Sequence, residues 1–229
     1  MTVSPIPRGW DEHVCERLAN LKAGPSEALP LPSVSGGHVR LAPFTAGMVA
    51  DDALIEALTR WRAENISGFT KLFRPTFEGT RAWSRSQLIE RADRILFLVL
   101  SADGRPVGHV GLSSFDFDAG TCEIDNVVRG ERTAPPGTMA QAVGAVLDWA
   151  YRNLEPAEIR LRTLAENTRA LALYHRLGFV PVSLIPLRRV TADDVTEWLE
   201  TERDDRIDKF FVLMAHRPQS EDAKTAGGK

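Results

Sequence analysis

Two carboxylates, Glu123 and Asp125, lie two positions apart in the stretch TCEIDNVV, whose alternating polar and apolar residues predict a β-strand over 121–128. Side chains two positions apart share one face of a strand and lie about 7 Å from each other. The pattern gives the strand two faces, with Glu123, Asp125 and Val127 on one and Cys122, Ile124 and Asn126 on the other. A carboxylate can take a proton from a substrate or hold a cation. Two of them on one face of a covered sheet therefore predict either the lining of a cleft or ion pairs at a rim.

His109 lies on the strand predicted just before this one, in the stretch PVGHVGL. If residue 109 pairs with residue 127 across the hairpin, the imidazole shares the face of the two carboxylates, and a slip of one residue reverses this. A single histidine on a strand is more typical of a structural role, so both interpretations stay open.

A second pair, Asn167 and Tyr174, lies in the stretch ENTRALALYHRLGF at 166–179. Seven residues make two turns of an α-helix, so the amide and the phenol lie nearly in register on one side. Apolar residues form a neighbouring stripe, and Gly178 is placed to end the helix. The simplest interpretation is a small core helix with a capping asparagine and a buried tyrosine.

The stretch DNVVRGERTAPPGTMAQ leads from the first strand into the strongest amphipathic pattern, which predicts a helix over 137–154. Thr138 and Gln141 fit a capping box at its start. Glycines and arginines precede or adjoin that start: Arg129, Gly130, Arg132 and Gly137. A helix N-terminus with free N–H groups is a natural phosphate site, although a well-capped helix after a Pro-rich loop explains the same residues. The glycine spacing matches neither a P-loop nor G-x-G-x-x-G.

The elements that must position these residues are predicted in the order β-α-α-β-β-β-α-β-α-β-β. This is a mixed α/β (α+β) fold, with a central, mostly antiparallel sheet and helices on both faces. The acidic stretch at 191–208 could flank a cationic substrate, but a solvated helix and turn is the preferred interpretation. Residues 1–37 are expected to form an extension with a helix at about 9–22 and a linker, 38–216 the folded domain, and 217–229 a disordered tail.

The composition narrows the class of protein. The chain has 229 residues, 43% of them hydrophobic, which suffices for one globular domain with appendages. The net charge of −3 gives no general attraction to nucleic acid or anionic lipid, and no apolar run approaches the roughly 18–20 residues that span a bilayer. The N-terminus lacks the apolar core of a signal peptide, and Cys15 and Cys122 show no metal or redox spacing. We therefore expect a reduced cytoplasmic protein, a monomer or homodimer, with no membrane, nucleic-acid or metal partner.

The helix and loop patterns together resemble the GNAT family of acyl-CoA N-acyltransferases. ENTRALALYHRLGF is similar to the family signature N-x-x-A-x-x-x-Y-x-x-x-G-F, which is matched by Asn167, Ala170, Tyr174, Gly178 and Phe179. The predicted order of elements over about 38–216 is also similar to that fold.

The family's pyrophosphate loop, Gln/Arg-x-x-Gly-x-Gly/Ala, is matched less fully. It would end on Gly137 to Met139, with Ala134 in place of the leading Gln or Arg and Met139 in place of the final small residue. Arg129 or Arg132 is expected to supply the missing charge.

The resemblance implies acetyl-CoA as co-substrate and gives roles to the residues above. The implied cofactor contacts are Val127, Val128, Arg129, Gly130, Arg132, Gly137, Thr138, Met139, Asn167 and Ala170. Pantetheine would pair with the strand at 121–128 where it splays from the one at 158–164. Tyr174 would protonate the leaving thiolate, and Glu123 or Asp125 would deprotonate the attacking amine or bind its ammonium. The sequence does not choose between the two acids.

The acceptor is expected to be a small-molecule amine. Residues 69–94 hold four aromatic side chains among six basic and three acidic residues, and such a set suits a sugar ring, a base or a phosphate, although a solvated amphipathic helix explains it too. The candidate acceptor contacts are His109, Phe73, Arg74 and Trp83. The phrases EIDNVVRGE, RILFLV and GHVGL resemble acetyltransferases of surface-sugar and deoxysugar pathways, which implies a nucleotide-linked amino sugar.

Other functions stay open. A protein or peptide acceptor would need an open groove, and an aminoglycoside-like polyamine would prefer an acidic pocket. A non-catalytic acyl-CoA-binding module and a purely structural α/β domain are the alternatives outside the enzymes.

Overall fold

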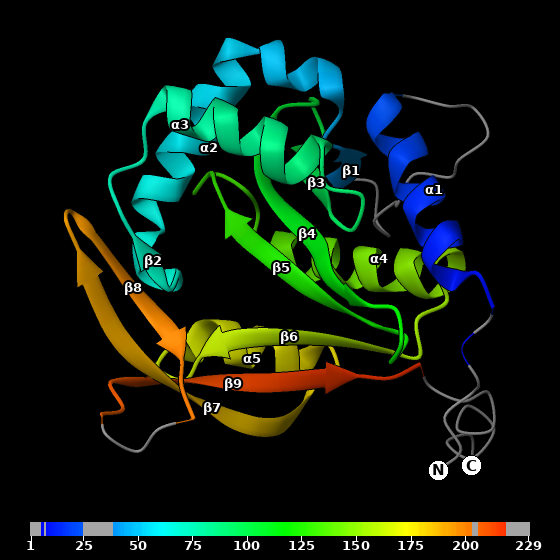
Figure 1. Cartoon of the computed structure of the whole chain (residues 1–229). Coiled ribbons are helices and arrows are strands. Elements are labelled where there is room, and N and C mark those ends of the chain that lie inside the picture. Colours follow the sequence, from blue (N-terminus) through cyan, green and yellow to red (C-terminus); the bar gives the residue numbers. More distant parts are fainter. Residues whose placement is uncertain (1–5, 7, 25–38, 203–205, 219–229) are drawn as a thin grey trace.

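The computed structural model describes residues 6, 8–24, 39–202 and 206–218 (Figure 1). Within them nine strands form one sheet in the order β1-β3-β4-β5-β6-β9-β7-β8-β2, and every neighbouring pair is antiparallel except β5 with β6. The strands are β1 (Val39–Pro43), β2 (Lys71–Leu72), β3 (Ile95–Ser101), β4 (Pro106–Asp116), β5 (Thr121–Arg129), β6 (Glu158–Leu164), β7 (Val180–Ala192), β8 (Val195–Glu200) and β9 (Lys209–His216). This confirms the predicted mixed, mostly antiparallel sheet. The expected linker and tail fall largely on 25–38 and 219–229, outside the described residues.

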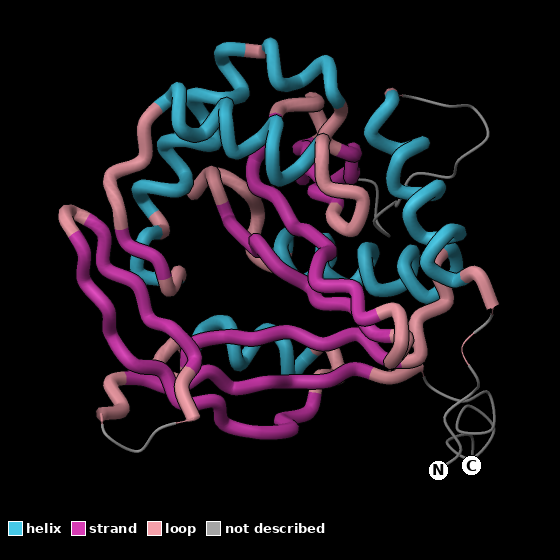
Figure 2. The backbone as a smooth tube through the Cα atoms, in the orientation of Figure 1, coloured by secondary structure: helices cyan, strands magenta, loops and turns pink. Residues whose placement is uncertain are grey.

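Helices lie on both sides of the sheet, as predicted (Figure 2). They are α1 (Trp10–Ala23), α2 (Asp52–Glu64), α3 (Phe77–Trp83), α4 (Thr138–Asn153) and α5 (Thr168–Arg176), with short turns η1 (Ala46–Ala50), η2 (Ile66–Gly68) and the π-helical η3 (Ser84–Ile89). One core contains side chains of α1, α4 and α5, and a second contains side chains of α2 and η3. Among the described helices, none combines the length and apolar character that a membrane crossing requires.

The strands β5 and β6 lie side by side only at their first residues. Their parallel pairing joins 121–123 to 158–160, and the described residues form no further pairs between them. β5 then continues to Arg129 beside β4, and β6 continues to Leu164 beside β9. The two strands therefore diverge beyond Glu123 and leave backbone edges that face each other across the opening (Figure 1).

β5 carries a bulge at Asn126, whose φ is +47°. The register with β4 shifts at this point, so that His109 pairs with Val128 while Gly111 pairs with Asp125. The pairing of residue 109 with residue 127 that was considered from the sequence is not formed.

The bulge also changes which face each side chain takes. Val127 packs against the same core as Ile124, and Val128 enters the opposite core. The prediction that Val127 shares the face of Glu123 and Asp125 is therefore wrong. A period of two assumes an unbroken ladder, and one inserted residue reverses every position after it.

The acidic stretch at 191–208 contains the strand β8 and a hairpin turn at 193–194, so the predicted turn is present and the predicted helix is wrong. β8 forms a hairpin with β7, and its other edge pairs with β2, where Lys71 lies opposite Glu197. Acidic side chains are common on such exposed outer strands because charge discourages unwanted pairing. Since β2 belongs to the connection between α2 and α3, this pairing joins that connection to the far end of the sheet (Figure 1).

The predicted N-terminal helix forms as α1 and belongs to the main core. Trp10, Val14, Leu18 and Leu21 are buried there. The Trp10 indole N–H donates to the carbonyl of Leu154 at the end of α4. α1 is thus bound to the folded body by both packing and hydrogen bonding.

Candidate active site

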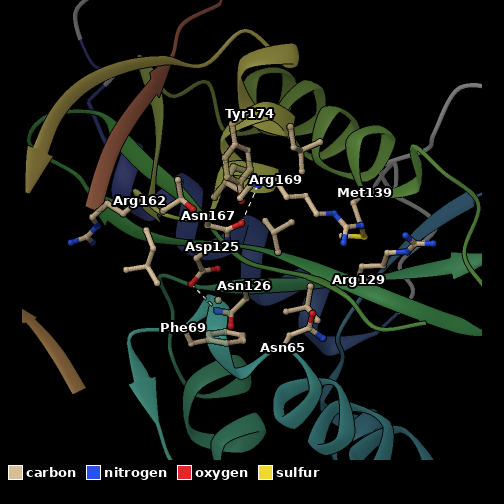
Figure 3. A pocket seen from close by; sticks show the side chains of 18 of the residues that line it. Asn65, Phe69, Asp125, Asn126, Arg129, Met139, Arg162, Asn167, Arg169 and Tyr174 are labelled. Atoms are coloured by element: carbon tan, nitrogen blue, oxygen red, sulfur yellow. Dashed lines mark hydrogen bonds between the residues drawn. The ribbon is translucent and has the colours of Figure 1, made fainter. Parts of the chain in front are cut away.

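A cavity of about 600 Å³ lies where β5 and β6 diverge (Figure 3). One wall comes from the first turn of α4 and from α5, and the opposite wall comes from residues 64–70 after α2. The diverging strands lie between these walls. Glu123, Asp125 and Tyr174, the three residues predicted to do chemistry, all line this cavity.

Asp125 accepts hydrogen bonds from three donors, which lie on β5, on β4 and just before β3. Its Oδ2 accepts hydrogen bonds from Ser113 Oγ at 2.7 Å, Asn126 Nδ2 at 2.9 Å and Arg94 Nη2 at 3.1 Å. Its Oδ1 is buried without a partner among the described residues, and a Cβ at Gly111 would lie 2.3 Å from it. Burial raises the pKa of Asp125, although Arg94 opposes the effect. A carboxylate with a raised pKa and an unpartnered oxygen is suited to accept a proton.

Glu123 is ion-paired, with its Oε2 3.0 Å from Arg162 Nη2. Arg162 also binds Glu200 of β8, so its guanidinium links β5 to β8 across the divergence. Burial raises the pKa of Glu123 and Arg162 works against that shift. Both predicted interpretations of the acids are therefore correct, because Glu123 and Asp125 line the cavity and are also ion-paired.

Tyr174 lies near the end of α5 with 7% of its surface exposed. Its ring meets Phe179 edge-on, with the ring centroids 5.8 Å apart. Burial raises the pKa of Tyr174 to about 12, and the nearby carboxylate of Asp125 adds to the shift. The phenol is therefore protonated at neutral pH, and its hydroxyl is available as a donor inside the cavity.

Asn167 caps α5, since its Oδ1 accepts a hydrogen bond from the Ala170 N–H at 3.2 Å. This confirms the capping interpretation. Both residues also line the cavity, so the amide N–H₂ of Asn167 is left at the cavity wall (Figure 3). The helix ends at Gly178 with φ at +88°, as predicted, because a left-handed residue is needed there.

α4 begins after Gly137, which takes a left-handed φ of +88° as the N-cap. Thr138 is the first helical residue and donates its hydroxyl to the Pro135 carbonyl at 2.8 Å, so the predicted capping box with Gln141 is wrong. The first-turn N–H groups of Met139 and Ala140 have no intrahelical acceptor, and both residues line the cavity. The Thr138 N–H already donates to the Pro135 carbonyl at 3.2 Å. This wall therefore offers the positive end of a helix to an anion.

Arg129 shapes the loop before α4. Its Nη2 donates to the carbonyls of Arg132 at 2.8 Å and Ala134 at 2.5 Å, and its side chain also lines the cavity. Arg132 is exposed and lies outside the lining. Gly130 is also outside it and is pressed against Trp61, where a Cβ would lie 2.1 Å from the indole.

His109 lies outside the cavity lining and supports the bulge from behind. Its Nδ1 donates to the Asn126 carbonyl at 2.6 Å, because a carbonyl can only accept. Burial lowers the pKa of His109 to about 4, so the ring is neutral at pH 7. The other residues predicted to contact the acceptor, Phe73, Arg74 and Trp83, lie outside the lining as well. Within the described residues, no three His, Cys, Asp or Glu side chains are grouped so as to hold a metal ion.

The lining also contains residues that the sequence reasoning did not single out. Arg169 and Arg176 of α5 add positive charge, and Figure 3 shows Arg169 extending toward Met139. Asn65 and Phe69 come from the wall after α2. The two arginines are seven residues apart on α5, so the spacing that selected Asn167 and Tyr174 would have found them too.

Comparisons with known proteins agree on one family of folds. The sequence matches the family model described as "Acetyltransferase (GNAT) domain" over residues 39–180. The "N-acetyltransferase 9-like protein" of Caenorhabditis briggsae is 24% identical over 153 residues, which cover 62% of this chain and 75% of that protein.

Solved structures agree in fold. Spermidine N-acetyltransferase from Vibrio cholerae in complex with CoA and spermine is similar with a TM-score of 0.60 at 17% identity, covering 80% of this chain and 96% of that one. RimL, a ribosomal L7/L12 alpha-N-protein acetyltransferase, is similar with a TM-score of 0.63 at 13% identity, covering 86% and 99%. At these identities the likeness shows the fold alone.

Proposed function

This chain belongs to the GNAT family of acetyltransferases, and from that membership we propose that it acetylates the primary amine of a small, hydroxyl-rich molecule, with a nucleotide-linked amino sugar as the leading candidate. The enzyme class, an N-acetyltransferase with acetyl-CoA as co-substrate, follows from the family. The acceptor and the residue roles are the proposal. The observation that carries it is the meeting of Tyr174, Asp125 and a polar wall in one cavity at the divergence of β5 and β6.

The cavity suits the co-substrate. The first-turn N–H groups of α4, with Arg169 and Arg176, would bind its phosphate groups. Beyond Glu123 the edge of β5 that faces β6 has no strand partner among the described residues, so the backbone at Val127 and Val128 can pair with the amides of pantetheine as an added strand would. Asn167 caps α5 with its oxygen and keeps its N–H₂ to bind the same arm.

Tyr174 and Asp125 are assigned the two proton transfers. The amine attacks the thioester carbon, a C–N bond forms, and the C–S bond breaks with its electrons on sulfur. Asp125 takes the proton that the amine loses, and the Tyr174 hydroxyl donates a proton to the sulfur. Asp125 is preferred over Glu123 because its Oδ1 has no partner among the described residues and both Asp125 and Tyr174 line the cavity. Glu123 is tied by Arg162 toward β8.

The charge of the lining favours an acceptor with one amine over a polyamine. Each of its three carboxylates already has an arginine partner: Glu64 with Arg60 at 3.9 Å, Glu123 with Arg162 at 3.0 Å, and Asp125 with Arg94 at 3.1 Å. A polyamine would have to compete with these arginines for its ammonium sites.

The wall after α2 favours a hydroxyl-rich molecule. Asn65, Ser67 and Thr70 offer amide and hydroxyl groups, and Phe69 offers a ring. Amides and hydroxyls both donate and accept hydrogen bonds, and a ring packs on the C–H face of a sugar. Of the aromatic and basic segment 69–94, only Phe69 and Thr70 line the cavity, so its lining adds no support for a nucleotide. The nucleotide part of the candidate therefore rests on the resemblance of the short sequence phrases alone.

The test is acetyl transfer to a panel of amines, with the acetylated products measured by mass spectrometry. The panel holds nucleotide-linked amino sugars, free amino sugars, spermidine and a short peptide with a free N-terminus. We expect the highest kcat/KM with an amino sugar and loss of that turnover in Asp125→Asn. Preference for spermidine or the peptide would overturn the acceptor. Full activity of Asp125→Asn would overturn the assigned base.

A further inference from the structure

A buried lysine of α1 contacts the connection that leads into β3. Lys22 belongs to the last turn of α1 and is only 5% exposed. Its Nζ donates a hydrogen bond to the carbonyl of Arg91. Burial lowers the pKa of Lys22 to about 8, so the ammonium is unfavourably placed but still mostly charged at pH 7. An apolar side chain would suit this position better, so the contact with the connection is what needs a reason.

The connection at 90–94, between η3 and β3, is also held from within. Arg91 donates twice to the carboxylate of Asp93, from Nε at 2.8 Å and from Nη2 at 2.6 Å. Asp93 also acts on Lys22, since its charge favours the ammonium. The lysine therefore fixes a compact turn at a point three residues before Arg94.

The other end of this turn carries an arginine that binds the proposed base. Arg94 Nη2 donates to Asp125 Oδ2 at 3.1 Å, and both side chains are largely buried. The Nε of Arg94 is buried without a partner among the described residues. An arginine side chain has many rotamers, so the place of its guanidinium depends on the backbone from which it extends. The position of the turn therefore decides how well Arg94 meets the carboxylate.

The contact makes the two oxygens of Asp125 unequal. Ser113, Asn126 and Arg94 all donate to Oδ2, whereas Oδ1 has no partner among the described residues. Arg94 is also the strongest of the neighbours that lower the pKa of Asp125 against the effect of burial, and Arg91 of the same turn acts in the same direction. The turn thus anchors one oxygen and keeps the carboxyl more easily ionised.

We propose that Lys22 and Arg94 are positioning residues for the reaction: Lys22 fixes the turn at 90–94 from α1, and Arg94 holds Asp125 by one oxygen so that the other can accept the proton of the amine. The inference rests on the proposed function, because it concerns the base assigned there. It adds two residues that do not line the cavity, and one of them lies outside the residues that match the family model.

The first experiment titrates Asp125 directly and needs no acceptor. Carboxyl ¹³C chemical shifts of the full chain are followed against pH, and Asp125→Asn identifies the resonance. Arg94→Met should move the midpoint up by at least about 1 pH unit, because a nearby opposite charge lowers a carboxyl pKa by about 1–3. Lys22→Met keeps the length of the side chain without its donor, and should move the midpoint up by about 0.5 pH unit, because a displaced guanidinium keeps part of its effect. Lys22→Arg, which keeps charge and donor, should titrate like the wild type.

The second experiment tests whether Lys22 acts through Arg94. The double variant Lys22→Met/Arg94→Met should titrate like Arg94→Met alone, because a guanidinium that is absent cannot be displaced. A direct effect of the lysine charge on Asp125 would instead add to the effect of Arg94→Met.

Val14→Ala is the matched control for a purely structural role of α1. Val14 is fully buried in the main core on the same helix, so its truncation weakens the packing of α1 and leaves Lys22 in place. Val14→Ala should lower Tm and leave the titration of Asp125 unchanged.

The outcomes separate this inference from the proposed function. An unchanged midpoint in Lys22→Met, additive shifts in the double variant, or an equal shift in Val14→Ala would each overturn the role of Lys22 and leave the proposed function intact. If Arg94→Met does not fold, the comparison of Lys22→Met with Lys22→Arg and Val14→Ala still decides. The kcat/KM profile of the best acceptor in the panel supplies the last test. Its acidic limb should move with the midpoint in Lys22→Met, and a limb that stays in place would overturn Asp125 as the base.

Discussion

Replacing Tyr174 with phenylalanine separates the chemistry of the site from its folding. The ring packs against Phe179, and its hydroxyl has no protein partner among the described residues. Tyr174→Phe keeps the ring contact and leaves no orphaned acceptor behind, so the free energy of unfolding should change by less than about 1 kcal/mol.

The catalytic effect should be large and independent of pH. Assistance by a general acid contributes about 10²–10⁴-fold, so kcat should fall by that factor, which is about 2.7–5.5 kcal/mol in the barrier. The pKa of Tyr174 is about 12, so the phenol stays protonated and the loss should be constant over about pH 6 to 9. Release of CoA, followed with a thiol-reactive dye, measures kcat, and calorimetry should show nearly unchanged affinity for acetyl-CoA.

The chain's other tyrosine provides a matched control. The hydroxyl of Tyr151 donates to the His216 carbonyl at 2.6 Å, outside the cavity lining. Tyr151→Phe should cost about 1–3 kcal/mol, or about 2–12 °C in Tm, and leave kcat unchanged. The reasoning is refuted if Tyr174→Phe turns over like the wild type, or if the two variants lose stability and activity alike.

Three further predictions test the cap, the acids and the buried histidine. Asn167→Ala should lose about 1 kcal/mol with the cap, and Asn167→Asp should keep it, yet both should bind acetyl-CoA more weakly in calorimetry; unchanged affinity in Asn167→Asp would leave only the capping role. Because burial raises the pKa of Asp125, kcat/KM should fall as the pH drops through that raised value. This acidic limb of the pH profile should vanish in Asp125→Asn and persist in Glu123→Gln. The opposite pattern would make Glu123 the base. The pKa of His109 is about 4 in the folded state and about 6.5 in the unfolded state, so the unfolded state takes up the proton first as the pH falls. Up to about 3 kcal/mol of stability should therefore be lost between pH 6.5 and pH 4. Urea unfolding of His109→Gln should show a weaker pH dependence over that range, and an equal dependence would contradict the buried neutral ring.

Local signals in the sequence were strong where one short segment carried the whole pattern. The helix at 137–154 was predicted within one residue of α4, and Gly178 marked the end of α5 because only a left-handed residue completes that turn. The two strand acids and Tyr174 were found for the same reason. A spacing of two on a strand, or of seven on a helix, keeps side chains on one face when the element folds. All three residues line the cavity.

Features that depend on a distant partner were not predictable in this way. The bulge at Asn126 is stabilised by a hydrogen bond from His109 on the neighbouring strand. The residue types next to position 126 do not predict a bulge. The many acids of the stretch that contains β8 suggested a solvated helix. The segment is a strand because it pairs with β7 and β2, which are distant or not recognisable in its local sequence. Long-range pairing, rather than propensity, decided both.

The helix α1 has a consequence for where this protein can be cut. The family match begins at residue 39, yet Trp10, Val14, Leu18 and Leu21 of α1 lie in the core. A fragment that begins at residue 39 and keeps the rest of the chain would lose about 1.5–3 kcal/mol for each of these side chains and would expose the apolar surface they cover. Expression of such a fragment should give aggregated material, while a tag placed ahead of α1 should leave the fold intact. The segment that folds as one unit in this enzyme therefore includes α1 and is longer than the segment that matches the family model.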